Sequence, residues 1–500
     1  MATVSTQTAA PVPSAPVDSP PASGPVRSLL WRVLLPAIAI ASGALLWLDF
    51  EPEVVGVLGL VMMLTLMAMK VPLGVAMGIP GILGTWSIVG WHAAEGSLRR
   101  LPLESAANWS LTVLPMFILM GLLLWRSGLT EHLYSVARVW VGWLPGGLAI
   151  GTNLAGAGFA ALSGSTMGSI FPLSRAGMPE MLKAGYDRRL ALGSIAAAGT
   201  LAHLIPPSLF LLIYAGVASV PVGPQLMAGL IPGVLLALLY CITIVVLSLL
   251  KPALVGGRRA GQHRYSMGER VRSLGKIWDA PLLIVVVVAG IYGGFFTVTE
   301  AGAVGAAGAL VICLIRRRGK NPLRAITQAA TETVSTVGAM FFLLVGAYLL
   351  SRMMSVTGLA SWFAEMVIDL EMSRVAFLIT MVVVYIILGM FMDSLAMMLL
   401  TVPIILPLFA TLGISEIWFG VFLVVFMELA VLTPPVGVLS YILHNIVQDR
   451  EVNLGQRISI GAVFQGVLCV IPVALLLVGL MIAFPEIVTW LPDSMPTAGG

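Results

Sequence analysis

Residues 163–170 read SGSTMGSI and residues 199–208 read GTLAHLIPPS, and the same arrangement returns as FMDSLAMM at 391–398 and ELAVLTPPVG at 428–437. An offset of 228 residues superimposes the second set on the first. In each set a small or polar stretch precedes a paired proline, and the surrounding sequence is apolar enough to lie in lipid. Matching interruptions in two halves of a membrane protein are the best sequence indication of a transporter binding site. The matched positions include Ser165 with Asp393, Thr200 with Glu428, Ile205 with Thr433, and Pro206 with Pro434.

The composition is that of a polytopic membrane protein. Hydrophobic residues make up 59% of the 500 residues and charged residues only 10%, whereas about a quarter of a soluble protein is charged. The three cysteines are too sparse for a disulfide framework or a metal cluster. The basic residues lie in loops between apolar runs, so they report membrane orientation and do not indicate nucleic-acid binding.

Charge placement along the chain predicts a topology. Arg27 and Arg32 lie at the start of the first apolar run, and the acidic residues Asp49 and Glu51 follow it, which places the N-terminus in the cytoplasm. Apolar runs of suitable length give about eleven crossings, so the C-terminus lies outside. This layout leaves only four of the 27 Lys and Arg residues outside the cytoplasm, namely Arg99, Arg100, Arg352 and Arg374. The segment 92–107 reads as a polar loop.

Two stretches rich in small residues predict re-entrant hairpins with opposite orientations. The first hairpin, at 141–176, has basic residues near both ends and opens to the cytoplasm, while the second, at 375–410, opens to the outside. The predicted fold is therefore an all-α polytopic membrane protein with an inverted repeat, which is a scaffold for alternating access. The predicted divisions are a disordered tail at 1–25, an additional transmembrane helix at 26–50, a membrane domain at 51–490 with repeats at about 108–250 and 326–485, and a tail at 491–500.

The paired prolines predict broken helices within the membrane. Proline supplies no N–H, and it pushes the preceding residue out of helical geometry. The break leaves backbone groups unpaired, and the half-helix N-termini suit a carboxylate while the free carbonyls suit sodium. Ser208 and Thr433 add hydroxyl groups at the two breaks.

Asp393 is the residue that most strongly suggests cation binding. A carboxylate in an apolar hairpin is expensive and is by default a functional hypothesis. Sodium prefers hard oxygen ligands, which Asp393, Ser394, Ser163, Ser165 and Thr166 could supply together with local carbonyls. The alternative is a structural role, because Asp before a helical run is a favoured N-cap.

Three further polar residues have open interpretations. Glu428 precedes the second break by five residues, and either couples a cation or is neutral and hydrogen-bonded to a neighbouring helix. His203 reads as a packed or hydrogen-bonded histidine. Glu300, in a turn, reads as a helix cap.

The sequence resembles the large membrane subunit of tripartite ATP-independent periplasmic (TRAP) transporters, the DctM-like family, over about residues 54–490. Five ordered motifs carry the resemblance: SGSTMG, PEMLKAGYDRRLALGSIAAAGTLAHLIPPS, YGGFFTVTEAGAV, LGMFMDSLAMMLLTVPIILP and FGVFLVVFMELAVLTPPVG. The resemblance implies a bacterial inner-membrane permease that works by an elevator-type movement. It would import organic acids, typically carboxylates, using a sodium gradient and no other cofactor. A periplasmic solute-binding protein would deliver the substrate, and a separate small membrane subunit would complete the permease.

The resemblance also assigns site residues. It implies a sodium site at Ser163, Gly164, Ser165 and Pro206, and a second at Asp393, Thr433, Pro434 and Gly437. Substrate between the hairpin tips would contact Ser165, Thr166, Ser208 and Ser394. His203 departs from the family pattern, in which we expect a small residue, and it would narrow or polarise the site. One extra span at 29–48 is too short to be a fused small subunit.

Two alternatives to this function stay open at this point. A stand-alone carboxylate carrier of similar architecture would need no binding protein. A membrane-embedded enzyme would need a nucleophile with a base or a metal cluster, and the five scattered histidines form no such motif.

Overall fold

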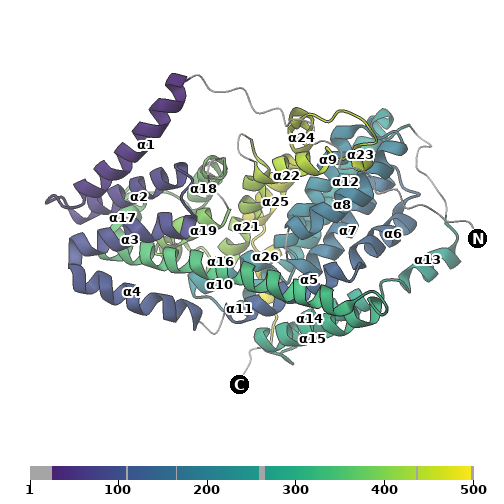
Figure 1. Ribbon diagram of the computed structural model, residues 1–500, viewed down its shortest axis with the longest axis horizontal. Coiled ribbons are helices and arrows are strands. Elements are labelled where there is room, and N and C mark those ends of the chain that lie inside the picture. Colours follow the sequence, from purple (N-terminus) through teal and green to yellow (C-terminus); the bar gives the residue numbers. More distant parts are fainter. Residues whose placement is uncertain are drawn as a thin grey trace, which may run out of the picture.

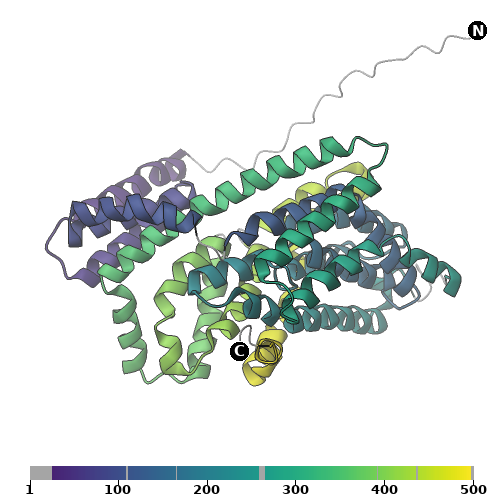
Figure 2. The same ribbon diagram turned by 90° about the horizontal axis from the view of Figure 1, so that it is seen from below.

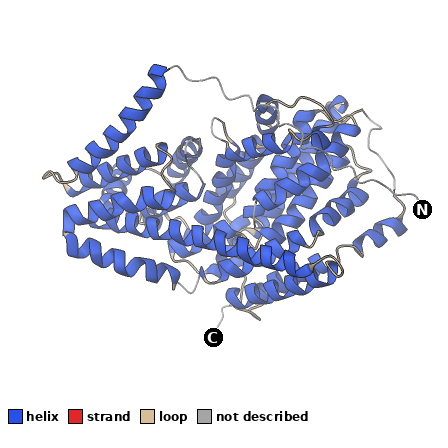
Figure 3. Ribbon diagram, in the orientation of Figure 1, coloured by secondary structure: helices blue, strands red, loops and turns tan. Residues whose placement is uncertain are grey.

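The computed structural model describes residues 25–496 except 108–110, 165, 258–264, 391, 393 and 435–436. Every element within the described chain is a helix, and an isolated bridge between Tyr186 and Val255 is the one strand-like pairing there (Figures 1 and 3). An α-helix satisfies its backbone hydrogen bonds internally, which a lipid-embedded segment requires. The prediction of an all-α membrane protein is confirmed.

The helices of the first half follow each other through short turns. Their bounds are α1 Pro25–Leu45, α2 Pro52–Ala68, α3 Leu73–Val89, α4 Trp91–Ala106, α5 Val113–Arg126, α6 Leu129–Val141, α7 Gly147–Ser163, α8 Thr166–Lys183, α9 Arg188–Thr200, the 3₁₀ turn η2 Leu201–His203, α10 Leu209–Ala218, α11 Val222–Ala228, α12 Leu230–Leu250 and the 3₁₀ turn η3 Pro252–Leu254.

The second half repeats this series. Its helices are α13 Met267–Leu274, α14 Asp279–Tyr292, α15 Val298–Arg316, α16 Pro322–Val356, α17 Leu359–Asp369, α18 Arg374–Gly389, α19 Ser394–Ile405, α20 Leu408–Leu412, α21 Glu416–Leu432, α22 Val438–Ile446, α23 Arg450–Asn453, α24 Ile460–Val467, α25 Ile471–Ala483 and α26 Glu486–Asp493.

Helix boundaries follow the same 228-residue offset as the motifs. Adding 228 to the start of α9 gives the start of α21, and adding it to the start of α8 gives the start of α19. The helix pairs α2–α3 and α14–α15 also correspond, although they precede the predicted repeat limits at 108 and 326. The correspondence therefore extends over more of the chain than the four quoted motifs.

A helix near the start of each half packs against a helix of the other half. Helix α3 packs along α16, and its counterpart α15 packs along α5, the counterpart of the middle of α16. Figure 2 shows α16 running across the molecule, and its 35 residues span about 50 Å. The α3–α16 contact is close because a Cβ on Gly346 would overlap the backbone of Gly74. Small residues permit such close approach between helices in membranes.

Both predicted hairpins are pairs of helices that contact each other. Helices α7 and α8 form the first and extend to residue 183, seven residues beyond the predicted end. Helices α18 and α19 form the second, near the predicted limits of 375–410. Their re-entry into a membrane and their inverted orientation stay predictions.

Long apolar helices are present, but they do not fix the number of crossings. By length and composition, four helices in the described residues could cross a membrane: Val222–Leu250, Val298–Arg316, Pro322–Val356 and Ile460–Ala483. Helices α13 and α14 meet at a 59° bend, as in a broken span or re-entrant loop. Eight shorter apolar helices accompany them in the described chain. The expected eleven crossings therefore stay a prediction.

The segment predicted as a polar loop at 92–107 is helical, and that prediction was wrong. Helix α4 carries two ion pairs at i,i+4 spacing, between Arg99 and Glu95 at 2.6 Å and between Arg100 and Glu104 at 3.0 Å. Such pairs stabilise a solvent-facing helix by a few tenths of a kcal/mol each. The polar residues of this segment therefore belong to a solvent-exposed helix and not to a loop.

Candidate functional site at the two helix breaks

The first paired proline interrupts a long helical segment, as predicted. Helix α9 ends at Thr200, η2 adds one tight turn, and α10 begins only after Ser208. Ser208 is fully buried and caps α10 by accepting a hydrogen bond from the backbone N–H of Leu211 at 3.2 Å. Its hydroxyl donates to the backbone carbonyl of His203, which the break leaves without a helical partner.

The first hairpin tip lies directly against this break. Gly164 ends α7 in the left-handed conformation, with φ of +55°. A Cβ at this position would lie 2.6 Å from the backbone oxygen of Pro207, so both the conformation and the contact require glycine. Ser163 is the last residue of α7, and Ser165 lies outside the described residues. Pro206, of the expected sodium site, is buried within the break.

His203 connects three parts of the site. Its Nδ1 lies 2.9 Å from Oγ1 of Thr166, at the start of α8, and is also hydrogen-bonded to Oε1 of Glu428 on α21. Its ring stacks on Phe210 of α10, with ring centroids 3.9 Å apart and planes 12° from parallel. The prediction of a hydrogen-bonded histidine is confirmed, and its partners come from both halves of the chain.

Glu428 is one of the few buried acidic residues in the described chain. It is 2% exposed, and one carboxyl oxygen faces His203 while Oε2 has no hydrogen-bond partner among the described residues. A buried polar group without a partner needs an explanation, because its desolvation is unfavourable by about 1–3 kcal/mol. Of its two interpretations, hydrogen bonding to a neighbouring element is present. A role in coupling a cation stays a prediction.

The second paired proline also ends a helix. Thr433 follows the last residue of α21 in an extended conformation, and its hydroxyl donates to the carbonyl of Leu429 at 2.6 Å. Ser440 of α22 donates to the freed carbonyl of Leu432 at 3.0 Å. Gly437 precedes α22 with φ of +37°, a left-handed value that glycine adopts without strain.

Pro434 is half-buried at the second break, whereas Pro435 lies outside the described residues. Asp393, the residue that most strongly suggested cation binding, also lies outside them. Its neighbour Ser394 begins α19, is 1% exposed, and donates to the carbonyl of Met427 at 2.8 Å. The second hairpin tip is therefore anchored to α21 immediately beside Glu428.

Two of the predicted site residues, Thr166 and Ser394, thus reach the same helix. Thr166 reaches α21 through His203, and Ser394 reaches it directly, so both hairpin tips meet on the helix that ends at the second break. The hydroxyl of Thr433 bonds within its own helix and does not join this network.

Sequence reasoning missed the stacking of Phe210 on His203, and the contact of Thr200 with Tyr240, whose hydroxyl groups lie 3.3 Å apart. The available sequence signal for the stacking of Phe210 was an aromatic residue seven positions after the histidine. The capping role of Glu300 is confirmed by a reciprocal capping box with Thr297.

Comparisons with known proteins agree with this architecture. Residues 60–487 match the family described as "Tripartite ATP-independent periplasmic transporter, DctM component". The C4-dicarboxylate TRAP transporter large permease protein DctM of Vibrio cholerae is 27% identical over 454 residues, which are 86% of this chain and 94% of that protein. Its namesake from Pseudomonas aeruginosa is 32% identical over 334 residues, 67% of this chain and 77% of that protein.

Another relative has the name DctMQ instead of DctM and is longer than the region that matches this chain. The isethionate TRAP transporter permease protein DctMQ of Oleidesulfovibrio alaskensis is 26% identical over 84% of this chain but only 63% of that protein.

Solved structures share the fold. The YdaH transporter of Alcanivorax borkumensis matches with a TM-score of 0.56 at 18% identity, over 87% of this chain and 99% of that chain. The MtrF structure from Neisseria gonorrhoeae matches with a TM-score of 0.52 at 12% identity, over 93% and 98%. Because the family match covers most of the chain and its described helices form a known transporter fold, this chain belongs to the DctM family of large permease components of bacterial TRAP transporters and is a multi-pass membrane protein.

Proposed function

We propose that this chain is the large permease subunit of a sodium-coupled importer of organic acids, working in a bacterial inner membrane. The observation that carries the proposal is that the first helix break and both hairpin tips contact α21, the helix that ends at the second break. Half-helix ends gathered at one place offer partial positive charge to a carboxylate and free carbonyls to a cation. The names of relatives support the substrate class, since they include C4-dicarboxylate and sialic acid permeases.

The first sodium ion would bind where the first hairpin tip touches the first break. Gly164 brings the tip within contact of the Pro207 carbonyl, so the backbone oxygens of Ser163 and Gly164 and those of the break would be available to one ion. Carbonyl and hydroxyl oxygens are the ligands that hard cations prefer.

The second sodium ion would bind at the second break. Carbonyls freed where α21 ends, the backbone at Gly437 and the carboxylate of Asp393 would supply its ligands together with Thr433 and Pro434. The left-handed turn at Gly437 supports this, because a Cβ there would lie 3.0 Å from the carbonyl oxygen of Leu432 and 3.1 Å from that of Thr433.

The acid would lie between the two hairpin tips, near Ser165, Thr166, Ser208 and Ser394. The hydroxyl groups of Thr166, Ser208 and Ser394 already have protein partners. The substrate would therefore be held mainly by N–H groups at the helix ends, and these hydroxyls would position the backbone that presents them.

Transport would follow alternating access in an inverted repeat, with an elevator-type movement of the two hairpins and broken helices. The N-terminus would be cytoplasmic and the C-terminus periplasmic, as the distribution of basic residues predicts. A small membrane subunit on a separate chain and a periplasmic solute-binding protein would complete the system, in keeping with the tripartite family to which the chain belongs.

The test is uptake by the permease reconstituted in liposomes, with and without a sodium gradient and with and without the binding protein. We expect uptake only when both are supplied. Undiminished uptake without sodium would contradict the coupling. Uptake of free substrate by this chain alone would instead support a stand-alone carrier.

A further inference from the structure

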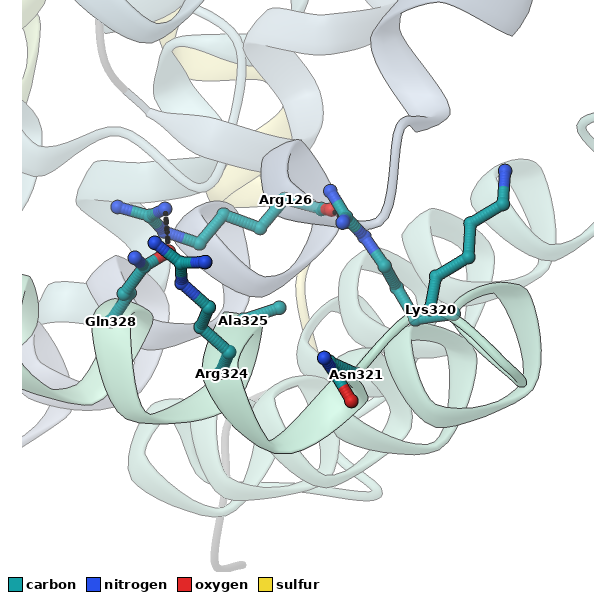
Figure 4. Close-up of a pocket in the computed structure, with 7 residues that line it drawn as sticks. Arg126, Lys320, Asn321, Arg324, Ala325 and Gln328 are labelled. Carbon is teal, nitrogen blue, oxygen red and sulfur yellow. Dashed lines mark hydrogen bonds between the residues drawn. The ribbon is translucent and has the colours of Figure 1, made fainter. Parts of the chain in front are cut away.

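A cationic pocket lies away from the helix breaks, where the end of α5 meets the loop between α15 and α16. Its volume is about 330 Å³. Figure 4 shows side chains from the three segments gathered around it. The lining residues are Arg126, Arg317, Lys320, Asn321, Arg324, Ala325 and Gln328.

The positive charge of the pocket is largely uncompensated. Arg126 pairs with Glu332 at 2.7 Å and donates to Gln328 at 2.8 Å. Arg317 uses Nε to bond the backbone carbonyl of Arg126, and no carboxylate within the described residues pairs with Arg317, Lys320 or Arg324. Four cations thus face one cavity with one carboxylate beside it, an arrangement that favours an anion.

The start of α16 adds to this field. The helix begins at Pro322, and its N-cap Asn321 has a left-handed backbone and makes no side-chain capping bond. No acidic residue lies in its first turn. The 35-residue helix therefore begins in the pocket wall, and no acidic residue of its first turn offsets the partial positive charge of its N–H groups.

A neighbouring helix favours a position of the pocket at the level of lipid headgroups. Helix α13 exposes Met267, Val271 and Leu274 on one face, and the exposed Trp278 follows it, as in a helix lying in the membrane interface. Arg316 ties this segment to α15 by bonding the carbonyl of Lys276 and the carboxylate of Asp279. The next residue is Arg317, so the pocket begins where the interfacial helix is anchored.

We propose that this pocket binds the phosphate headgroup of an anionic phospholipid. Arginine side chains bind phosphate oxygens with paired, charge-assisted hydrogen bonds, and basic pockets between membrane helices recognise anionic headgroups. The acyl chains would lie along the exposed apolar side chains of α15, including Val311 and Ile315. The lipid would hold α5, α15 and α16 together at the face predicted to be cytoplasmic.

The test compares lipid binding to the full chain and to a pocket variant. Lys320→Gln with Arg324→Gln removes two exposed cations that have no carboxylate partner in the described chain. Arg272→Gln with Arg318→Gln is the matched control, because it removes two exposed cations of nearby segments that do not line the pocket. Native mass spectrometry of protein in dodecylmaltoside would count retained dioleoylphosphatidylglycerol, with dioleoylphosphatidylcholine and inorganic phosphate as the other probes.

We expect the intact chain to retain phosphatidylglycerol in preference to phosphatidylcholine. The pocket variant should bind it about 30-fold more weakly, since each cation near the surface contributes roughly a fivefold factor. The control should change binding by less than about threefold. Equal retention of both lipids, equal loss in the control, or displacement of the lipid by inorganic phosphate alone would each overturn the proposal.

Discussion

Removing the imidazole of His203 should destabilise the protein because it leaves a buried carboxyl group without its partner. Glu428 is 2% exposed and already has one oxygen without a hydrogen-bond partner in the described chain. His203→Ala also removes the bond to Thr166 and the stacking on Phe210. Breaking a buried pair by removing one partner lowers the free energy of unfolding by about 3–5 kcal/mol.

A double-mutant cycle separates the pair from the other contacts of the histidine. Glu428→Gln retains the volume and hydrogen-bonding capacity of the side chain and should lower the free energy of unfolding by about 1–2 kcal/mol. In that background His203→Ala should lower it by only about 1–2 kcal/mol more, for the lost hydrogen bond and stacking. The coupling energy between the two residues should then be about 2–3 kcal/mol.

The measurement is unfolding in dodecylmaltoside micelles by titration with sodium dodecyl sulfate, followed by circular dichroism. His92→Ala is the matched control because His92 is exposed, and it should change the free energy of unfolding by less than about 0.5 kcal/mol. If the two site substitutions are additive within about 0.5 kcal/mol, His203 and Glu428 do not stabilise each other and the reasoning fails.

Three further substitutions test other parts of the site. Asp393→Asn should raise the sodium concentration for half-maximal uptake about tenfold or more, while membrane insertion is unchanged. An unchanged sodium dependence would instead indicate that Asp393 only caps a helix. Gly164→Ala should lower uptake and destabilise the protein by at least about 1–3 kcal/mol, because φ is +55° and the added Cβ has no room, whereas Gly479→Ala on α25, with nothing within 4 Å, should change neither. Ser394→Ala should lower the free energy of unfolding by about 1–3 kcal/mol, since it leaves the carbonyl of Met427 without this bond, and a thermal midpoint equal to that of the unchanged chain would contradict this.

The breaks and hairpins could be predicted because their causes are local. Paired prolines interrupt a helix wherever they occur, and the offset of 228 residues identified both copies. The positions of the chain turns followed from small residues and charges within the same segments. Helix α8 continues through Pro172 and Pro179 to Lys183, beyond the limit of 176 that composition and charge suggested for the first hairpin.

The contacts between distant segments could not be predicted in this way. His203 and Glu428 are 225 residues apart, and no sequence pattern indicates that they contact each other. The packing of α3 on α16 depends on close approach at Gly74 and Gly346, which single-sequence periodicity does not locate. Helix α4 is a different case, since the i,i+4 spacing of Glu95 and Arg99 indicates a helix although the segment has low hydropathy.

The His203–Glu428 bond also limits how the proposed elevator movement could occur. The two residues are not symmetry counterparts, because the offset places Thr200 opposite Glu428, and Thr200 contacts Tyr240 within the first half. The bond therefore joins the first break to the second broken helix by a contact that has no mirrored copy at these positions.

Separating the first break from α21 in each transport cycle would expose the carboxyl group of Glu428 or leave it buried without its partner, at a cost of about 3–5 kcal/mol. Sliding them together past α5 and α16 would avoid that cost. We therefore expect the two hairpins and the two broken helices to move as one unit, with the changing contacts at the surfaces that face α5 and α16. A crosslink between cysteines introduced on α10 and α21, which belong to the two broken helices and are in contact, should accordingly leave transport possible, whereas one between α16 and α19, which are also in contact, should stop it.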